Sequence, residues 1–369
     1  MARFEEIRTN IKSITEKALE GDVDAQNKLG VCYLHGLDGV KSYETAFVWF
    51  QRAAEAGYAK AQLNLGFCLF YGHGVKQNKK EAIEWYTKAA EQGLIGAQGI
   101  LGTCYLHGDG LIQNYEKAVK WFIKATEQGD TRAMNNLGYC YENGLGVEQN
   151  YNKAAQLYQK AAEHEITIGQ YNLARCYSVG HGVAQNDEKA AEWFLKAAQH
   201  EDAESQACLG HLYQNGLGVP QNYEKAIEWY SIAAEHGNAR GQNNLGRCYE
   251  EGLGVKQDLE KAFQLYNKAA DGNNAKGMNN LGACFLKGIG TSKNEGKAFE
   301  WFLKAAELGD PMAQYNVAFC FEHGIGTVKN DDNALFWLAR AAEQGDQDAE
   351  KAIKMILKKV QIVNDGNDS

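Results

Sequence analysis

Nine cysteines are the residues of this chain best suited to nucleophilic, redox or metal chemistry. Eight of them share one position in a 36-residue period, namely Cys32, Cys68, Cys104, Cys140, Cys176, Cys248, Cys284 and Cys320. The ninth, Cys208, belongs to the one period that carries Leu212 at that position. A position that also accepts leucine is apolar and favours burial, and the paired C-x2-C ligands typical of zinc sites are absent from the sequence. We therefore expect thiols that pack in a core, and neither a metal nor another cofactor.

Disulfides between these cysteines are not expected either. Successive copies of the helix that carries them should lie about two interaxial distances apart, roughly 16–20 Å. A disulfide requires Cα atoms within about 7 Å of each other. The shared position therefore predicts thiols without bridges.

Histidine and serine chemistry lacks its usual partners in this sequence. His35, His107 and His323 share one position, but at least one period separates each from the next, so they predict no cluster. The motifs H-E-x-x-H, G-x-S-x-G, S-x-x-K and Walker A do not occur. Eight glycine pairs of the form G-x-G could be mistaken for phosphate loops, yet the full G-x-G-x-x-G pattern after a strand is missing. We therefore expect a protein that is not an enzyme.

The elements that position these residues repeat every 36 residues without an insertion. Nine units align on Ala25, Ala61, Ala97, Ala133, Gly169, Ser205, Gly241, Gly277 and Ala313. In the second unit, Ala61, Leu65 and Leu69 recur at helical spacing and predict a first helix, which Gly72 ends. Asn78 is the candidate N-cap of a second helix over about 79–91, and it is matched by Asn114, Asn150, Asn186, Asn222, Asn294 and Asn330. Each unit is thus predicted to be a helix–turn–helix.

A glycine also recurs inside the first helix, at Gly30, Gly66, Gly102, Gly138, Gly210, Gly246 and Gly282. Glycine in a helix interior costs about 1 kcal/mol relative to alanine. Its recurrence predicts that two helices approach too closely at this point for a side chain.

The chain ends are predicted to cap the array. Residues 1–24 form a capping helix with an apolar stripe of Phe4, Ile7, Ile11, Ile14 and Ala18, before nine repeats over 25–348. Residues 349–363 form a second capping helix, with Ile353, Ile356, Leu357 and Val360 on its apolar stripe, and 364–369 form a disordered tail. Such caps keep a solenoid from exposing its last apolar face.

The recurring motifs L-G-x-C-Y, G-x-G-V, K-A-x-x-W-Y and K-A-A-E-x-G, seen for example from Leu137 to Glu163, resemble those of Sel1-like repeat proteins, relatives of the tetratricopeptide repeats. The resemblance covers 25–348. It implies an all-α, right-handed superhelical solenoid whose first helices line a concave groove. A cysteine-rich, secreted branch of the family carries disulfides and weak penicillin-related activities. This chain has Ala89, Ala90 and Ala97 where that branch has cysteines, which disfavours a weak hydrolase of that type.

The net charge of the chain limits the classes of partner that it is expected to bind. The formal net charge is −9, and no basic stripe is segregated, which disfavours binding to nucleic acid or to an acidic membrane surface. No window approaches about 18 uninterrupted apolar residues, so membrane insertion is not expected. The acidic residues within 1–6 do not fit a secretory signal. These features predict a monomeric cytoplasmic protein.

An asparagine ladder is the first candidate binding feature. It comprises Asn64, Asn136, Asn172, Asn244, Asn280 and Asn316, at one position of the first helix. In related solenoids, asparagines at this point bind the backbone of an extended ligand, since one amide supplies both a donor and an acceptor. The alternative is that these amides bond local backbone or groups of the neighbouring repeat. The sequence leaves both open.

A variable position lies on the same helix face, about one turn further on. There Arg175, His211 and Arg247 place positive charge in an acidic protein, and they could pair an acidic side chain or a C-terminal carboxylate. The aromatic residues on this face could form apolar pockets for a ligand: Phe67, Tyr71, Tyr139, Tyr171, Tyr315 and Phe319. The alternative is that all of these are ordinary surface and packing residues.

These features predict a scaffold or adaptor that binds an extended peptide or a partner segment of another protein in its groove. One alternative is a secreted effector or regulator that acts on a signalling or trafficking complex. The other is the weak hydrolase disfavoured above.

Overall fold

The computed structural model describes the backbone of residues 2–37 and 39–367 and the side chains of residues 11–37 and 39–358. These residues form twenty α-helices and no strand. They divide into two compact units, unit 1 over Met1–Gln185 and unit 2 over Asn186–Ser369. The first helix of a repeat is called the A-helix below, and the second the B-helix.

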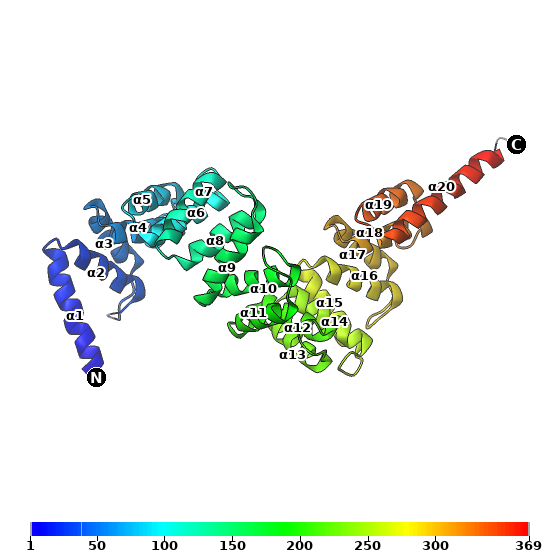
Figure 1. The fold of residues 1–369 in the computed structure, drawn as a ribbon, viewed down its shortest axis with the longest axis horizontal. Helices are drawn as coiled ribbons and strands as arrows, with labels where there is room; N and C mark the ends of the chain where they lie inside the picture. The colour runs from blue at the N-terminus through cyan, green and yellow to red at the C-terminus, as the bar shows by residue number, and fades with distance from the viewer. Residues whose placement is uncertain (1, 38, 368–369) are drawn as a thin grey trace. The chain divides into compact units, whose positions relative to one another are not determined.

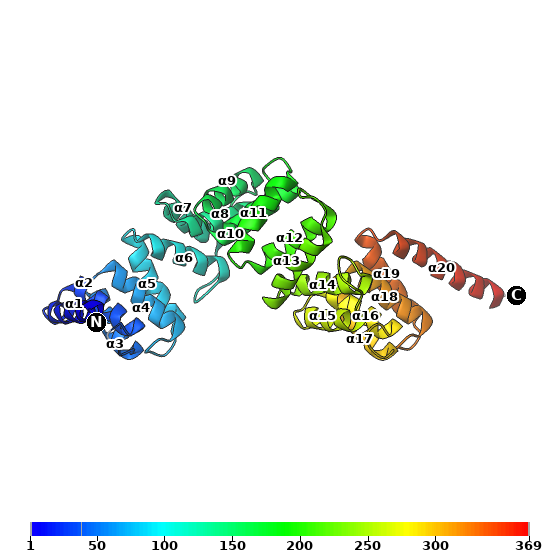
Figure 2. The same cartoon turned by 90° about the horizontal axis from the view of Figure 1, so that it is seen from below.

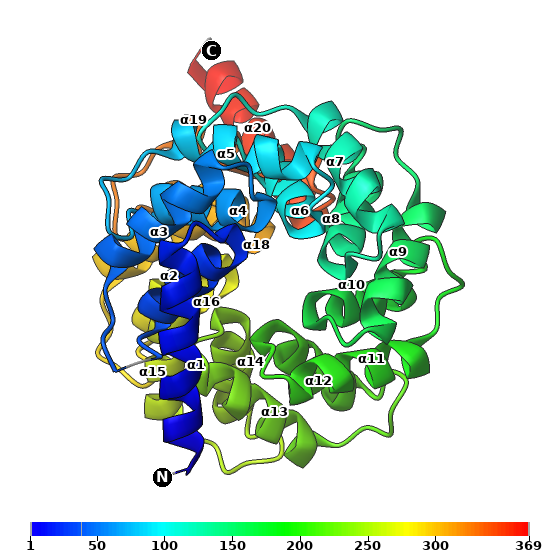
Figure 3. The ribbon, with the colours of Figure 1, turned by 90° about the vertical axis from the view of Figure 1, so that its left-hand side faces the viewer.

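Unit 1 begins with α1 and continues with alternating A- and B-helices. Its helices are α1 (Ala2–Leu19), α2 (Val23–His35), α3 (Tyr43–Glu55), α4 (Ala59–Tyr71), α5 (Lys79–Glu91), α6 (Ile95–His107), α7 (Tyr115–Glu127), α8 (Thr131–Asn143), α9 (Tyr151–Glu163) and α10 (Thr167–Val179). Each helix from α1 to α9 packs against the next one along the chain. In Figure 3, the A-helices α4, α6, α8 and α10 lie on the inner side of unit 1, and α5, α7 and α9 lie on its outer side.

Unit 2 has the same alternation and ends in a longer helix. Its helices are α11 (Asp187–Gln199), α12 (Ala203–Asn215), α13 (Tyr223–Glu235), α14 (Ala239–Glu251), α15 (Leu259–Asp271), α16 (Ala275–Lys287), α17 (Glu295–Glu307), α18 (Pro311–His323), α19 (Asp331–Glu343) and α20 (Gln347–Asn367). Figures 1 and 2 show the successive pairs stacked within each unit. The surface that the A-helices turn away from the B-helices is called the inner face of a unit. The prediction of an all-α solenoid is confirmed.

The predicted helix ends are found where the sequence places them. The Asn78 side chain accepts a hydrogen bond from the main-chain N–H of Glu81 and caps α5, and the other predicted asparagines cap their B-helices in the same way. Gly72 ends α4 with a φ of 75°, a left-handed conformation that glycine adopts without strain. Gly74 follows with a φ of 71°, and a Cβ there would overlap the main chain at Tyr43. The glycine pair therefore builds a turn that packs on the preceding repeat.

The glycine inside each A-helix accommodates an aromatic ring. A Cβ on Gly66 would lie 2.6 Å from Cε1 of Tyr86, a ring that is 2% exposed. The same pairing joins Gly30 to Phe50, and Gly102 to Phe122. The predicted close approach is therefore real, and the group that requires it is a B-helix ring that lies on the A-helix backbone.

Consecutive A-helices lie closer together than the sequence analysis expects. Residues of α6 and α8, and of α12 and α14, approach within 8 Å between Cα atoms. The expected spacing of 16–20 Å between A-helices is therefore wrong. The physical reason is that A-helices of successive repeats within a unit pack directly on each other, with side-chain amides such as those of Asn172 and Asn135 bonded between them.

The terminal helices cover the ends of the array. Ile14 and Ala18 of α1 pack against Ala25 and Leu29 of α2, while the side chains of Phe4 and Ile7 lie outside the described residues. In α20, Ala349 and Ile356 are buried in the core of unit 2 and Ile353 packs against it. Leu357, predicted for the same stripe, is 50% exposed, and the side chain of Val360 lies outside the described residues.

The last helix continues beyond the predicted cap. Helix α20 runs to Asn367, so 364–367 are helical where the sequence predicts a disordered tail, and residues 368–369 lie outside the described residues. No proline interrupts this segment. Relative to alanine, an ordinary residue in a helix costs at most about 0.7 kcal/mol and a glycine about 1 kcal/mol, so the helix can continue through these residues. In the part of the chain that the structure describes, no helix is both long enough and apolar enough to cross a bilayer.

Candidate functional site

The asparagine ladder connects consecutive A-helices. The Nδ2 of Asn64 donates to Oδ1 of Asn27 at 2.8 Å. Three other ladder members form the equivalent bond to the repeat that precedes them: Asn172 to Asn135 at 2.9 Å, Asn280 to Asn243 at 2.9 Å and Asn316 to Asn279 at 2.8 Å. Each acceptor is the residue that precedes the ladder position in the preceding repeat. The ladder amides therefore have a structural partner, which was one of the two alternatives left open.

The remaining two members have weaker or different bonds. Asn136 donates to Oγ1 of Thr103 at 3.4 Å, and Asn244 accepts from the neighbouring Asn243 at 3.3 Å. Asn172 is almost fully buried, whereas the other five ladder residues are half-buried. A half-buried amide still presents hydrogen-bonding capacity to a ligand on the inner face.

A row of glutamines gives the repeat a second polar connection, which the sequence analysis missed. Gln62 donates to the main-chain oxygen of Ala54 at 3.3 Å and accepts from Gln92 at 2.7 Å. The same pair of bonds is made by Gln98 and by Gln314. Each of these three glutamines therefore joins its A-helix to the B-helices on both sides of it. The recurring Ala-Gln dipeptide at the start of the repeat was the available signal.

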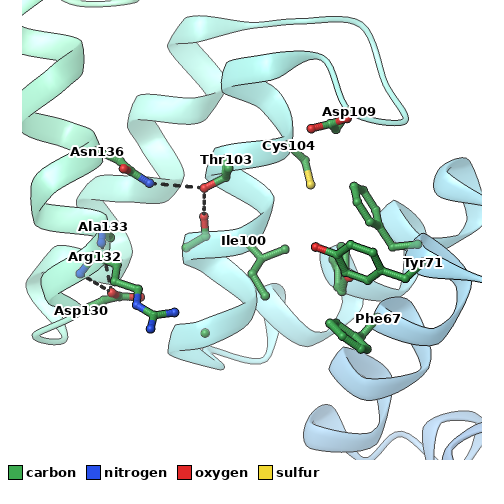
Figure 4. Close-up of a pocket in the computed structure, with 14 residues that line it drawn as sticks. Phe67, Tyr71, Ile100, Thr103, Cys104, Asp109, Asp130, Arg132, Ala133 and Asn136 are labelled. Atoms are coloured by element: carbon green, nitrogen blue, oxygen red, sulfur yellow. Dashed lines mark hydrogen bonds between the residues drawn. The ribbon is translucent and has the colours of Figure 1, made fainter. Parts of the chain in front are cut away.

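An open pocket lies on the inner face of unit 1, between α4, α6 and α8. Its volume is about 430 Å³. Figure 4 shows Phe67 and Tyr71 of α4 on one side, Ile100 of α6 across from them, and Asn136 with Arg132 of α8 on the far side. Three of the predicted groove residues, Phe67, Tyr71 and Asn136, therefore line one pocket. The rings of Phe67 and Tyr71 lie against each other, with centroids 4.7 Å apart.

Small residues keep this pocket open. Gly96 and Gly99 line it, and a Cβ on Gly99 would lie 2.8 Å from Oδ2 of Asp130. Ile100 stands at the ladder position of its repeat, so an apolar side chain replaces an asparagine there. The pocket thus combines an apolar wall with polar groups at its edge, a composition typical of ligand pockets.

Arg175 already has a carboxylate partner inside unit 1. Its Nη2 donates to Oε1 of Glu142 at 3.2 Å, and Tyr158 donates through Oη to Oε2 of the same residue at 2.7 Å. The guanidinium also lies over the ring of Tyr171, 5.8 Å from the centroid. Burial first, and then the hydrogen bond to Glu142, raise the pKa of Tyr158. A ligand carboxylate at Arg175 therefore has to compete with Glu142.

Arg247 occupies the equivalent position two repeats later, in unit 2, but it lacks that partner. The place of Glu142 is taken by Gln214, a neutral amide that accepts a hydrogen bond from Tyr230 at 2.8 Å. The Nε of Arg247 is buried without a hydrogen-bond partner among the described residues. Among the described residues, Arg247 forms no ion pair with a carboxylate comparable to that of Arg175 with Glu142.

His211 lies on the preceding A-helix of unit 2. Asn215 donates through Nδ2 to the main-chain oxygen of His211 at 2.8 Å and to its Nδ1 at 3.0 Å. An amide nitrogen only donates, so Nδ1 accepts and Nε2 carries the proton of the neutral ring. Burial, followed by the charges of Arg240, Arg247 and Lys276, lowers the pKa of His211.

The remaining predicted residues lie apart from the unit 1 pocket. Tyr139 of α8 is 44% exposed, and Phe319 of α18 is 39% exposed and packs on His323, with ring centroids 4.2 Å apart. Tyr315 is half-buried and contacts the core of unit 2. The sequence analysis missed Ile100, Thr103 and Arg132 in the pocket. A basic residue at the second position of several A-helices, such as Lys60 and Arg240, was the available signal for Arg132.

The cysteines are buried, as the repeat pattern predicts. Burial raises the pKa of the Cys68 thiol to about 11 and that of Cys104 to about 12. The thiolate is the nucleophile and the metal ligand, so these groups are poorly suited to either role at neutral pH. Among the described residues, no three or more His, Cys, Asp or Glu side chains gather in a way that could hold a metal ion.

Comparisons with known proteins agree with the repeat. The family model described as Sel1 repeat matches nine consecutive segments: 23–58, 59–94, 96–130, 131–165, 167–202, 203–238, 239–274, 275–310 and 311–346. A protective antigen present in uropathogenic Escherichia coli strains and displaying an SLR fold is 34% identical, with a TM-score of 0.68 over 94% of this chain and 82% of that chain. A Sel1 repeat protein from Oxalobacter formigenes is 30% identical, with a TM-score of 0.63 over 83% of this chain and 90% of that one. No curated protein matches the sequence.

Proposed function

Because the chain belongs to the Sel1 repeat family, we propose that it is a non-enzymatic scaffold whose inner face binds an extended segment of a partner protein. The observation that carries this proposal is the open pocket of about 430 Å³ between α4, α6 and α8. An apolar side chain of the partner enters between Phe67, Tyr71 and Ile100. Repeat folds of this kind offer a long face on which such a segment can lie.

The polar groups along the same face hold the backbone of the segment. Asn136 presents an amide at the pocket edge, and Arg132 adds donors on the same helix. The cross-repeat bonds of Asn64 and Asn172 use one donor of each amide. The second N–H and the carbonyl remain for a ligand at Asn64, which is half-buried, but Asn172 is too deeply buried for this role.

The proposal includes a cytoplasmic location. Disulfides form and persist in oxidising compartments and are rare in the cytosol. Cys68, Cys104 and Cys140 are thiols rather than disulfides, which fits a reducing compartment. Fractionation of the native cell, followed by detection of the chain, tests this part of the proposal.

The experiment for the proposed function compares two isoleucine variants of the full chain. Ile100→Glu places a charge in the pocket, and Ile112→Glu places the same charge at a turn residue of unit 1 that is 91% exposed and outside the pocket. We expect affinity capture from the native cell to lose its partner with Ile100→Glu and to keep it with Ile112→Glu. Both variants should unfold at the temperature of the wild-type chain. Capture that survives Ile100→Glu would overturn the proposal.

A further inference from the structure

Three cationic side chains and one histidine gather on the inner face of unit 2, although the chain as a whole carries a net charge of −9. Helix α12 contributes His211, α14 contributes Arg240 and Arg247, and α16 contributes Lys276. These three A-helices contact one another in order. The strongest charges acting on His211 are those of the other three residues, and all of them are positive.

The repeat explains why these residues meet. His211 and Arg247 occupy the same repeat position on successive A-helices, and Arg240 and Lys276 occupy another shared position near the start of their helices. The start of α14 lies beside the middle of α12, the preceding A-helix. The contact that shows this is between Nη1 of Arg240 and Sγ of Cys208 on α12, which are 3.5 Å apart. Arg240 thus lies on the side of α14 that faces α12.

Unit 1 provides an internal comparison for Arg247. At the equivalent place Arg175 is neutralised by Glu142, whose side chain is only 12% exposed. In unit 2 the corresponding Gln214 is neutral, and Nε of Arg247 is buried without a partner among the described residues. Arg247 as a residue is half-buried, but a buried polar N–H that makes no hydrogen bond is unfavourable. An anion that binds at Arg247 would supply what Glu142 supplies to Arg175.

The acidic residues of the same helices do not neutralise the cluster. On α14, the carboxylate of Glu250 accepts the hydrogen bond from Tyr266 at 2.6 Å, and Glu251 is exposed without an ion pair to Arg247 within 4.0 Å. On α12, Glu204 accepts from Asn238 at 2.9 Å, in the first turn of the helix. Helix α16 carries no acidic residue.

We infer that the inner face of unit 2 at His211, Arg240, Arg247 and Lys276 is a binding site for a carboxylate-rich segment of a partner protein. This inference rests on the proposed function, because it takes the ligand to be a segment of a partner protein. It adds that this segment is rich in carboxylates. Carboxylates match the donors present, since a guanidinium binds them in a bidentate manner. Asn244 on α14 and Asn280 on α16 belong to the same helices as the cluster, and their amides can bond the main chain of such a segment. A nucleic acid is a poorer ligand, because its long run of phosphates would meet the acidic remainder of the surface.

The test measures binding of a hexaglutamate peptide to the full chain. The peptide carries fluorescein at its N-terminus and an amide at its C-terminus, and binding is followed by fluorescence anisotropy at low salt. We expect hexaglutamate to bind and the matched hexaglutamine peptide not to bind. Arg247→Gln should weaken the binding at least tenfold, because it removes the arginine without a carboxylate partner. The control Arg175→Gln should change the dissociation constant less than twofold.

Folding is checked on the same variants. Arg247→Gln should keep the thermal midpoint of the wild-type chain, because this half-buried arginine forms no ion pair among the described residues. Hexaglutamate should also shift the NMR signals of the His211 ring, which places the peptide at the cluster. Equal weakening by Arg247→Gln and Arg175→Gln, or no weakening by either, would overturn the inference. Tighter binding of inorganic phosphate or of an oligothymidylate through Arg247 would overturn the assignment to carboxylates.

The two proposals fail separately. Ile100→Glu should leave hexaglutamate binding unchanged, since Ile100 lies in unit 1. Hexaglutamate binding through Arg247 without any partner captured through the unit 1 pocket would contradict the proposed function and support the anion site. Partner capture through Ile100 without hexaglutamate binding would contradict the anion site alone.

Discussion

The side-chain amide of Asn172 on α10 donates to Oδ1 of Asn135 on α8 across 2.9 Å. Both side chains are nearly inaccessible, at 8% and 6% exposure. Asn135 in turn donates to Asn136 at 3.4 Å, and Asn136 donates to Thr103 on α6 at 3.4 Å. A chain of side-chain hydrogen bonds therefore crosses three A-helices of unit 1, from α10 through α8 to α6.

Asn172→Ala should destabilise unit 1 by about 1–3 kcal/mol, because it leaves the buried Oδ1 of Asn135 without a partner. Asn143→Ala is the matched control, since that amide is exposed and bonds only within its own helix, and it should cost less than about 0.5 kcal/mol. Urea unfolding followed by circular dichroism measures both. The double variant with Asn135→Ala should cost less than the sum of the single variants. Equal effects of Asn172→Ala and Asn143→Ala would contradict a structural role for the ladder.

Gly66→Ala should destabilise the chain although alanine favours helices. The new Cβ would lie 2.6 Å from the ring of Tyr86, and overpacking of this kind costs about 1–3 kcal/mol. That cost exceeds the gain in helix propensity of about 1 kcal/mol. The thermal midpoint should fall accordingly.

Gly296→Ala in α17 is the control for this prediction. Its nearest neighbour would be Oδ1 of Asn294 at 3.6 Å, an ordinary contact distance. This substitution should therefore leave the thermal midpoint unchanged or raise it. A similar response of Gly66 and Gly296 would mean that the Tyr86 ring moves aside without cost.

The scaffold of this protein is largely readable from its sequence, because the repeat shows each structural position nine times. Asn78 is recognisable as an N-cap and Gly72 as a helix end from their local chemistry alone. Cys68 is recognisable as a core residue because another repeat has leucine at its position. The first two assignments follow from the chemistry of nearby residues, and the third follows from comparison with the other repeats.

The inner face was less predictable, because its chemistry depends on contacts between repeats. The ladder positions were visible, but the acceptor of Asn172 is Asn135, which lies 37 residues away and becomes a neighbour only when A-helices pack directly. The same direct packing of A-helices brings Ile100 of α6 opposite Phe67 of α4 in the pocket. Whether Arg175 or Arg247 is neutralised depends on a residue of the preceding repeat, Glu142 or Gln214, and single-helix patterns do not show this pairing.

Because the thiols are buried, we expect the free energy of unfolding to fall at alkaline pH. Burial raises the pKa of Cys68 to about 11 from 9.0, and that of Cys140 and Cys248 to about 11 as well. The folded state then holds these protons more tightly than the unfolded state. The contribution of each thiol to stability is complete below pH 9 and is lost as the pH rises toward 11, at up to about 1.4 kcal/mol per pH unit.

Urea unfolding at pH 7, 8, 9 and 10 measures this dependence. The free energy of unfolding should be nearly constant between pH 7 and 8 and should fall between pH 9 and 10. Tyrosines with raised pKa values, such as Tyr58 at about 12, act in the same direction at higher pH. In the folded chain, Ellman's reagent should react slowly with the thiols at pH 8. Rapid reaction of most thiols before unfolding would show that they are accessible and would remove the basis for the pH dependence.

Gln214→Glu should convert the unpaired arginine of unit 2 into the paired arrangement of unit 1. The new carboxylate would stand where Glu142 stands relative to Arg175, so it should form an ion pair with Arg247 and keep the hydrogen bond from Tyr230. Replacing the amide in this way is expected to change the free energy of unfolding by less than about 1 kcal/mol, because burial of the carboxylate is offset by the arginine. Binding of hexaglutamate should weaken at least tenfold, since the chain now supplies its own anion. Gln264→Glu makes the same change of net charge at an exposed position of the B-helix α15, and it should leave the dissociation constant within twofold. If both variants bind hexaglutamate as the wild-type chain does, Arg247 is not the residue that holds the anion.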